Sequence, residues 1–490
     1  MSKRSELLLL VALLALVAVT RFYRLGAESL WLDEAATYLR AVRSLPDLVS
    51  NSIARMHNPT YFLMMHAWIT LGDDEVMLRA PSAVFGICVA GAGYALGRVV
   101  GGILVGTTTL LLVALAPQQL RYAQEARMYS MYAFATTLAL AGLLWLVQHP
   151  EQAALWPRPR DERVPGDHAG RAWLAFGTGT LLALYTHNTA VFFVAAAWLG
   201  AGVAWAAHSE YRRPLFYRWF IANALVFFGW SLWLPHLLGQ TGRIGKQFWA
   251  TFPPLDTISR DLRDLFLFTS NRTLLLPTGV AIAAVFGLWS LRKRPIPAAV
   301  LALAAVAPPL MILAVSLKRP IFLPRIMLWS TVPFFVVVAS GICALEHRFL
   351  RPLALIALLV LGGRNLQHSY YGTQRKPDWR GALSHVAANV SEDSTVLLIG
   401  GREIRLVRYY LRRKSDPIPD FKTRWAEPPR LDKFLAGKRW AWLITAVDSA
   451  NSKEILSMMK TRGRLVWQRK YGKGLRIVKY RVGAKDAGGA

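Results

Sequence analysis

A succession of long apolar segments constrains this 490-residue chain more than any other feature. About eleven of them are long enough to cross the ~30 Å hydrocarbon core of a bilayer if some tilt is allowed. These segments are residues 6–23, 80–97, 102–117, 128–148, 172–186, 189–207, 219–238, 273–291, 296–316, 326–344 and 352–363. With 54% hydrophobic residues and 18 tryptophans, the composition excludes an array of water-soluble domains. The sequence therefore predicts a polytopic α-helical membrane protein with about eleven transmembrane helices.

Positive charges between the apolar segments predict how the chain is oriented. The first segment follows Lys3 and Arg4 and resembles an uncleaved signal anchor, which places the N-terminus inside. Counting crossings from there, the loops that fall in the cytoplasm are the basic ones around Arg98, Arg160, Arg213, Lys293 and Arg351. This agrees with the positive-inside rule. The remaining loops, and everything after Gly363, are then predicted to lie on the extracytoplasmic side.

The segment Asn58–Trp68 is apolar but short, and Asp73, Asp74 and Glu75 follow it. We interpret it as a helix that lies along the outer surface, because a crossing here would move every later basic loop to the wrong side.

The C-terminal region has a different character and divides the chain into residues 1–363 and 364–490. Buried strands are predicted at 395–401 and 440–445, helices near 379, at 402–413 and at 450–461, and a hairpin at 464–482. This alternation predicts a small extracytoplasmic α/β domain. Its Lys and Arg residues outnumber its acids by more than two to one. The predicted partner of this charge is the anionic lipid headgroup, with an anionic glycan as the alternative and no nucleic acid.

An acidic pair, Asp33 and Glu34, follows the first span within Ser29-Leu30-Trp31-Leu32-Asp33-Glu34-Ala35-Ala36-Thr37-Tyr38. Carboxylates are costly beside hydrocarbon, so a pair at this boundary is a candidate functional site. The alternative is that the acids merely cap a helix that begins near Ala35.

Cationic side chains on the outer face form a second set of candidates. Glu125 and Arg127 open one span, where the arginine can grip a phosphate and the glutamate can orient it, or the acid can simply favour a helix N-terminus. Lys318, Arg319 and Arg325 lie together on the outer side, against the positive-inside trend. A lipid phosphate accounts for Arg325 best, and snorkelling anchors are the alternative.

A lone histidine, His187, lies in a very short outer turn, where a hydrogen-bonded turn residue is the favoured interpretation and contact with substrate or a metal is the alternative. The sequence contains no cluster with the spacing of a metal site, and no cofactor is certain. A divalent cation held by Glu34 or Glu125 stays open.

The order of these motifs resembles bacterial glycosyltransferases of the C-type membrane fold. The motifs are Trp31-Leu32-Asp33-Glu34, Asn58-Pro59-Thr60-Tyr61, Leu78-Arg79-Ala80-Pro81, Gln124-Glu125-Ala126-Arg127, Tyr185-Thr186-His187-Asn188 and Pro324-Arg325. More narrowly, they look like the glycosyltransferase family 39 relatives, the protein mannosyltransferase and lipid A aminoarabinose transferase group. The resemblance covers roughly residues 1–345. It departs at Ile326, where such enzymes usually have a tyrosine.

The resemblance implies an inverting transferase in the bacterial cytoplasmic membrane that moves a sugar from a polyprenyl phosphate to an acceptor hydroxyl. Asp33 would be the catalytic base, with Glu34 beside it. Arg127 and Arg325, supported by Lys318 or Arg319, would stabilise the departing lipid phosphate. The acceptor is a lipid, a glycan or a protein. A polymerase or ligase of lipid-linked oligosaccharide is the alternative, and a flippase or transporter is disfavoured because no internal repeat is found.

Overall fold

The computed structural model describes residues 2–153, 168–208, 210, 212–239, 252–268, 274–445 and 450–483. Contacts divide the chain into two compact units. The helical unit consists of Met1–Tyr23, Pro46–Tyr61 and Ala80–Gly372, and the α/β unit of Arg24–Leu45, Phe62–Arg79 and Thr373–Ala490. The predicted boundary between a transmembrane domain, residues 1–363, and a C-terminal domain, residues 364–490, stays a prediction. The predicted cytoplasmic loop around Arg160 lies outside the described residues.

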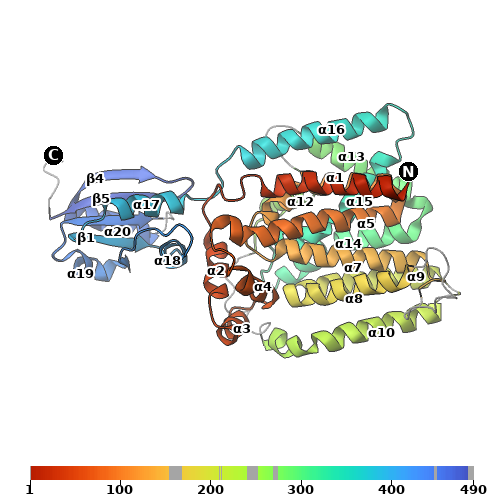
Figure 1. The fold of residues 1–490 in the computed structure, drawn as a ribbon, viewed down its shortest axis with the longest axis horizontal. Helices are drawn as coiled ribbons and strands as arrows, with labels where there is room; N and C mark the ends of the chain where they lie inside the picture. The colour runs from red at the N-terminus through yellow and green to blue at the C-terminus, as the bar shows by residue number, and fades with distance from the viewer. Residues whose placement is uncertain are drawn as a thin grey trace. The chain divides into compact units, whose positions relative to one another are not determined.

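Long apolar helices account for most of the helical unit (Figure 1). They are α1 (Lys3–Phe22), α5 (Glu75–Leu115), α7 (Tyr129–Gln148), α8 (Ala169–Thr186), α9 (Ala190–Ala207), α10 (Arg212–Trp230), α13 (Leu275–Ser290), α14 (Pro295–Ser316), α15 (Thr331–Cys343) and α16 (Leu350–Asn365). Eight helical segments among the described residues are long and apolar enough to cross a membrane. The predicted class, a polytopic helical membrane protein, is confirmed.

The segment α5 contains two predicted spans joined by a tight turn, at which the chain reverses direction. The backbone leaves helical geometry at Gly101 and at Gly102, whose φ of +74° lies in the left-handed region that favours glycine. A methyl group added at Gly93 would lie 3.5 Å from the side chains of Thr109 and Val113, so the helices on either side of this turn pack against each other. The spans predicted at 80–97 and 102–117 are therefore two separate helical segments.

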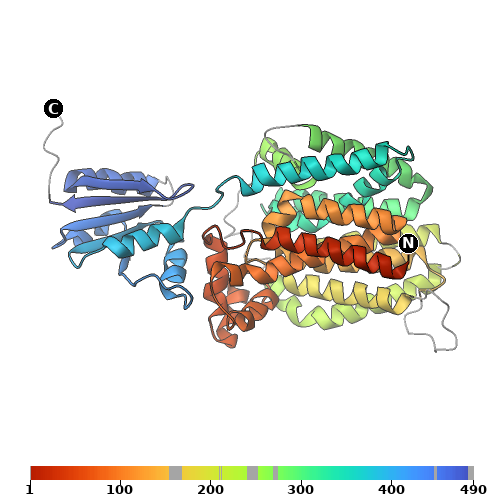
Figure 2. The same cartoon turned by 45° about the horizontal axis from the view of Figure 1, so that its top comes forward.

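Small residues allow two of the spans to approach closely. A methyl group added at Gly287 of α13 would come 1.9 Å from the carbonyl oxygen of Val337 in α15. One added at Gly341 of α15 would come 2.0 Å from the carbonyl oxygen of Ala283. Glycine at both positions lets the backbones touch, and such contact drives helix association in lipid. The pairs α7 and α8, and α9 and α14, also pack together. Helices α7 and α8 run side by side in the two views (Figures 1 and 2).

Short helices connect the spans. They are α2 (Leu32–Ala41), α3 (Leu45–Ala54), α4 (Thr60–Trp68), α6 (Pro117–Ala123), α12 (Leu255–Phe266) and the 3₁₀ segment η4 (Pro324–Ser330). Helix α4 occupies the predicted surface segment, and its 9 residues rise only ~14 Å, less than half of a hydrocarbon core. This length agrees with a helix that does not cross.

A five-stranded sheet of order β2-β1-β3-β5-β4 forms the centre of the C-terminal region. The strands are β1 (Ser394–Ile399), β2 (Thr423–Trp425), β3 (Trp440–Thr445), β4 (Gly463–Lys470) and β5 (Arg476–Val482). The first three are parallel, and β3, β5 and β4 are antiparallel. The helices are α17 (Trp379–Asn389), α18 (Ile404–Arg412), α19 (Leu431–Leu435) and α20 (Ala450–Arg462). The predicted α/β class is confirmed; β2 and α19 were not predicted.

Burial explains why the central strands were recognised and the edge strand β2 was not. Strands β1 and β3 are buried along almost their whole length, so they appear in the sequence as continuous apolar runs. Leu397, Leu443 and Val478 pack with Ile455 and Met459 of α20 in one apolar core. Strand β2 has only 3 residues and no buried position, and therefore gives no such signal.

Candidate functional site

The predicted site residues fall into two groups, one in each compact unit. Asp33 and Glu34 lie in the α/β unit, and the candidates from Glu125 to Arg325 lie in the helical unit.

Helix α2 begins at Leu32, earlier than predicted, so both acids lie in its first turn. Consecutive helical residues point in directions about 100° apart, and the two carboxylates therefore have different surroundings. Asp33 is half-buried, and its carbonyl oxygen accepts a hydrogen bond from Thr37 Oγ1 at 3.1 Å. Glu34 is fully buried. Only Asp33 thus retains partial access to solvent.

Glu34 is the centre of a buried ionic cluster. Its Oε1 accepts a hydrogen bond from Arg79 Nε at 2.8 Å, and its Oε2 accepts from Arg79 Nη2 at 3.0 Å and Lys376 Nζ at 2.8 Å. The backbone N–H of Trp31 also donates to Oε2, at 3.1 Å. Burial by itself would raise the pKa of Glu34, but the charges of Arg79 and Lys376 outweigh it and hold this pKa well below its usual range.

Arg79 makes the cluster rigid, because each of its N–H groups has an acceptor. Besides its two bonds to Glu34, the guanidinium donates to three carbonyl oxygens of the segment before α2. These oxygens belong to Leu25 (2.7 Å), Glu28 (2.8 Å) and Ser29 (3.0 Å). A planar guanidinium suits this fixed arrangement, which an ammonium group could not reproduce.

The second group surrounds the ring of Tyr129, the first residue of α7. The guanidinium carbons of Arg127 and Arg325 each lie 5.7 Å from the centroid of this ring. Arg127 is buried and Arg325, at the start of η4, is half-buried. The fold thus brings two cations from distant parts of the sequence to one aromatic ring, at the outer limit of a cation–π contact.

His187 connects the α8–α9 turn to the same group. Its ring lies 5.3 Å from that of Tyr132 in a stacked arrangement, and 6.1 Å from that of Tyr129. Nδ1 accepts a hydrogen bond from the backbone N–H of Thr189 at 3.3 Å, which leaves the proton of a neutral ring on Nε2. Burial, together with the positive charges of Arg127 and Arg325, lowers the pKa of His187 to about 3. The imidazole is therefore a neutral group beside two cations.

Glu125 is buried next to these residues. Its Oε1 accepts a hydrogen bond from Arg121 Nε at 3.3 Å, and its Oε2 has no hydrogen-bond partner among the described residues. Burial raises the pKa of Tyr122, whose hydroxyl also experiences the charges of Glu125 and Arg325. The charge of Glu125 therefore acts on the same hydroxyl as the charges of Arg121 and Arg325.

Lys318 and Arg319 are placed differently. Both are exposed at the C-terminal end of α14, where their backbone N–H groups bond to the carbonyl oxygen of Val315. These two side chains are therefore exposed, whereas that of Arg127 is buried.

Several residues of these groups were not singled out from the sequence. Arg79 occurs in one of the motifs that carry the family resemblance, and a cation at the outer start of a span was a usable signal. Nothing local marks Lys376 or the role of the Tyr129 ring. No set of three or more His, Cys, Asp or Glu residues in the described part of the chain could hold a metal ion.

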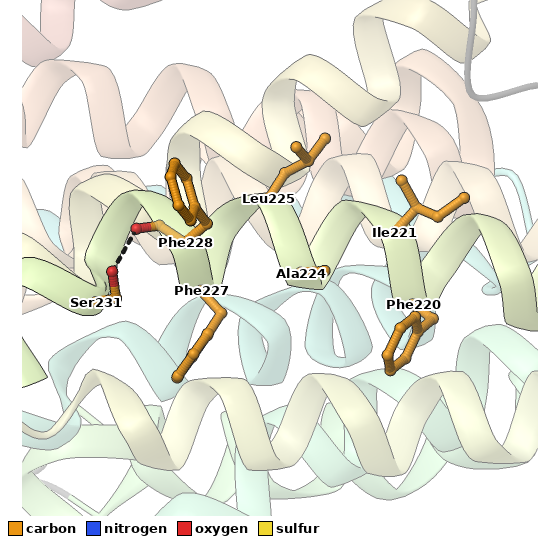
Figure 3. A pocket seen from close by; sticks show the side chains of 7 residues that line it. All are labelled: Phe220, Ile221, Ala224, Leu225, Phe227, Phe228 and Ser231. Atoms are coloured by element: carbon orange, nitrogen blue, oxygen red, sulfur yellow. Dashed lines mark hydrogen bonds between the residues drawn. The ribbon is translucent and has the colours of Figure 1, made fainter.

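An apolar groove of about 580 Å³ lies along α10 (Figure 3), and none of the site residues described above lines it. It is lined by Phe220, Ile221, Ala224, Leu225, Phe227, Phe228 and Ser231. The hydroxyl of Ser231 donates to the carbonyl oxygen of Phe228 at 2.8 Å, so the polar side chain in the lining is used within the helix. An exposed face of this kind on a spanning helix contacts lipid chains.

Comparison with protein-family models and with curated protein sequences finds no match. Among solved structures, the fold is similar to ArnT from Cupriavidus metallidurans in the apo state, with a TM-score of 0.60 and 14% identity over 96% of this chain and 97% of that one. For the same protein bound to undecaprenyl phosphate, the TM-score is 0.54 and the identity 15%, over 100% of both chains. For the oligosaccharyltransferase of Archaeoglobus fulgidus in the apo form, the TM-score is 0.51 and the sequence identity is 13%, over 95% of this chain and 73% of that one. The chain thus has the C-type glycosyltransferase fold predicted from its motifs.

Proposed function

We propose that this protein is an inverting glycosyltransferase that moves a sugar from a polyprenyl phosphate to an acceptor hydroxyl. The reaction takes place at the extracytoplasmic face of a bacterial cytoplasmic membrane. The observation that carries the proposal is the group of Arg127, Arg325 and neutral His187 around Tyr129. The likeness to a fold solved with undecaprenyl phosphate supports the same class of ligand.

The charge of this group fits a phosphate. Two guanidinium groups at one ring repel each other, and an anion bound beside them offsets that repulsion. His187 adds no third charge but supplies an N–H donor from Nε2. When the bond between the anomeric carbon and the phosphate oxygen breaks, the electron pair passes to that oxygen, and Arg127 and Arg325 stabilise the developing charge.

Asp33 serves as the general base of the proposed reaction. It takes the proton of the acceptor hydroxyl as the acceptor oxygen attacks the anomeric carbon from the face opposite the phosphate, which inverts the configuration. The products are the glycosylated acceptor and the free polyprenyl phosphate, and the proton passes from Asp33 to water. Glu34 does not exchange this proton, because Arg79 and Lys376 keep it ionised, and it orients the start of α2.

The remaining candidates have supporting roles in the proposal. Glu125 orients the backbone of Arg127, whose N–H bonds to the Glu125 carbonyl oxygen at 2.7 Å, and Lys318 and Arg319 attract the anionic donor to the site. The basic C-terminal region contacts anionic lipid headgroups.

The decisive variant is Asp33→Asn, compared with wild type in a strain that lacks the gene. Mass spectrometry of envelope lipids and glycans first identifies the species that disappears on deletion, and so names the sugar and the acceptor. Asp33→Asn should fail to restore that species, with a loss of ~10²–10⁴ in rate, and should still bind undecaprenyl phosphate. Near-normal turnover would refute the assignment of Asp33 as the base.

The solved oligosaccharyltransferase fold favours one second candidate, transfer of a lipid-linked oligosaccharide. The same mass spectrometry separates the two functions, since a polymerase or ligase would change the length of glycan chains, whereas the transferase adds a single sugar.

A further inference from the structure

The C-terminal region is bonded to the segment that leads into α2. Three consecutive residues of this segment, 28 to 30, each bond to a residue after position 372. The bonds join Arg375 N to Glu28 Oε1 (2.6 Å), Ser29 Oγ to Asp378 Oδ1 (3.1 Å) and Leu30 N to Tyr410 Oη (2.8 Å). All of these residues belong to the α/β unit. The region therefore does more than contribute charge: it fixes where α2 begins.

Lys376 extends this connection to the acidic pair. Its side chain is 11% exposed, and its Nζ lies 2.8 Å from Glu34 Oε2. Arg79 alone already matches the charge of Glu34. The second cation thus adds a tether between α2 and the C-terminal region, at the cost of burying one more charge.

Glu34 connects Lys376 to the first turn of α2, in which Asp33 also lies. It is the third residue of α2, and its carboxylate also accepts the N–H of Trp31, which precedes the helix. Fixing Glu34 at both oxygens fixes the backbone of the first helical turn, and Asp33 lies within that turn. The hydrogen bonds of Glu34 therefore set the direction in which the side chain of Asp33 leaves the helix.

We propose that Lys376 is a positioning residue for Asp33, through which the C-terminal region takes part in the transfer reaction. The inference rests on the proposed function, because it assumes that Asp33 is the base. Misplacement of a reacting group by about 1 Å costs up to ~10²-fold in rate. Loss of the Lys376 tether should accordingly lower turnover while leaving donor binding intact, since donor binding depends on Arg127 and Arg325.

The test compares Lys376→Met, Lys376→Arg and the control Lys438→Met in the full-length protein. Lys438 is also a lysine of the C-terminal region, and its Nζ donates to the carbonyl oxygen of Glu392 at 2.7 Å. Turnover is followed with the polyprenyl-phosphate sugar that mass spectrometry of the deletion strain identifies. Binding is measured with undecaprenyl phosphate in nanodiscs. Hydrogen exchange of residues 30–38 reports the order of α2 independently of activity.

Lys376→Met should reduce kcat by roughly 10- to 100-fold, leave undecaprenyl phosphate binding within about 2-fold, and speed exchange in residues 30–38. Lys376→Arg should retain most of the wild-type kcat, and Lys438→Met should have the wild-type kcat, donor binding and exchange rates. Normal kcat in Lys376→Met overturns the inference, and so does a parallel loss of kcat, donor binding and thermal stability. If Asp33→Asn is inactive while Lys376→Met is normal, only the positioning role fails. If Asp33→Asn is active, the base of the proposed function fails.

Discussion

Replacing Arg79 with leucine should destabilise the α/β unit more than any exposed ion-pair mutation. The change removes both bonds to Glu34 and the bonds to three backbone carbonyls, at distances of 2.7 to 3.0 Å. Glu34 retains Lys376 and the N–H of Trp31, so its charge is not left wholly uncompensated. Removing one partner of a buried ion pair costs about 3–5 kcal/mol. For a unit of this size that corresponds to a fall in Tm of roughly 6–20 °C.

The control for this measurement is Arg462→Leu. Arg462 also bonds to both oxygens of one carboxylate, that of Asp432, but this carboxylate is 71% exposed. Exposed pairs contribute about 0–1 kcal/mol. Thermal unfolding of the intact protein in nanodiscs should therefore show a small shift for Arg462→Leu and a large one for Arg79→Leu.

A double-mutant cycle tests the physical reason for the difference. Glu34→Leu leaves the buried Arg79 without its carboxylate, whereas Arg79→Leu combined with Glu34→Leu removes both charges. The double variant should be more stable than the sum of the single changes predicts, by at least ~1 kcal/mol. Additive effects, or a loss below ~1 kcal/mol for Arg79→Leu, would show that the ion pair does not hold this segment.

Three further predictions concern the phosphate group and the topology. Arg325→Lys should lose much of its transfer activity and Arg319→Lys little, because an ammonium replaces a snorkelling cation but not a bidentate clamp; normal turnover in Arg325→Lys would make Arg325 an anchor. Since the pKa of His187 is lowered to about 3, between pH 7 and pH 5 a proton binds mainly the unfolded state. The free energy of unfolding of the wild type should therefore fall by about 2 kcal/mol from pH 7 to pH 5, and that of His187→Gln should fall less. Thermal unfolding with the same pH dependence in both proteins would contradict this. In a background without native cysteines, an impermeant maleimide should label Ser384→Cys but not Glu346→Cys on intact spheroplasts, and the reverse pattern would place the C-terminal region in the cytoplasm.

Much of the secondary structure was predictable because its signals are local. Apolar runs of membrane-spanning length marked the long helices of the helical unit, and buried runs marked β1 and β3. The turn at Gly101 and Gly102 was predicted as the gap between the spans 80–97 and 102–117. Strand β2 was not predicted, because three residues with no buried position carry no periodicity.

The sequence by itself determined which residues were chemically notable: an acidic pair after the first span, and arginines in loops that are predicted to lie on the outer side, where the positive-inside rule disfavours them. Only the tertiary structure decided that Glu34 is fully buried between Arg79 and Lys376 while its neighbour Asp33 stays partly accessible. It likewise decided that Arg127 and Arg325 meet at Tyr129. The physical reason is the separation along the chain over which each signal acts. Hydrophobic periodicity and charge bias act over a few turns of chain, whereas an ion pair between residues hundreds of positions apart depends on how the whole unit packs.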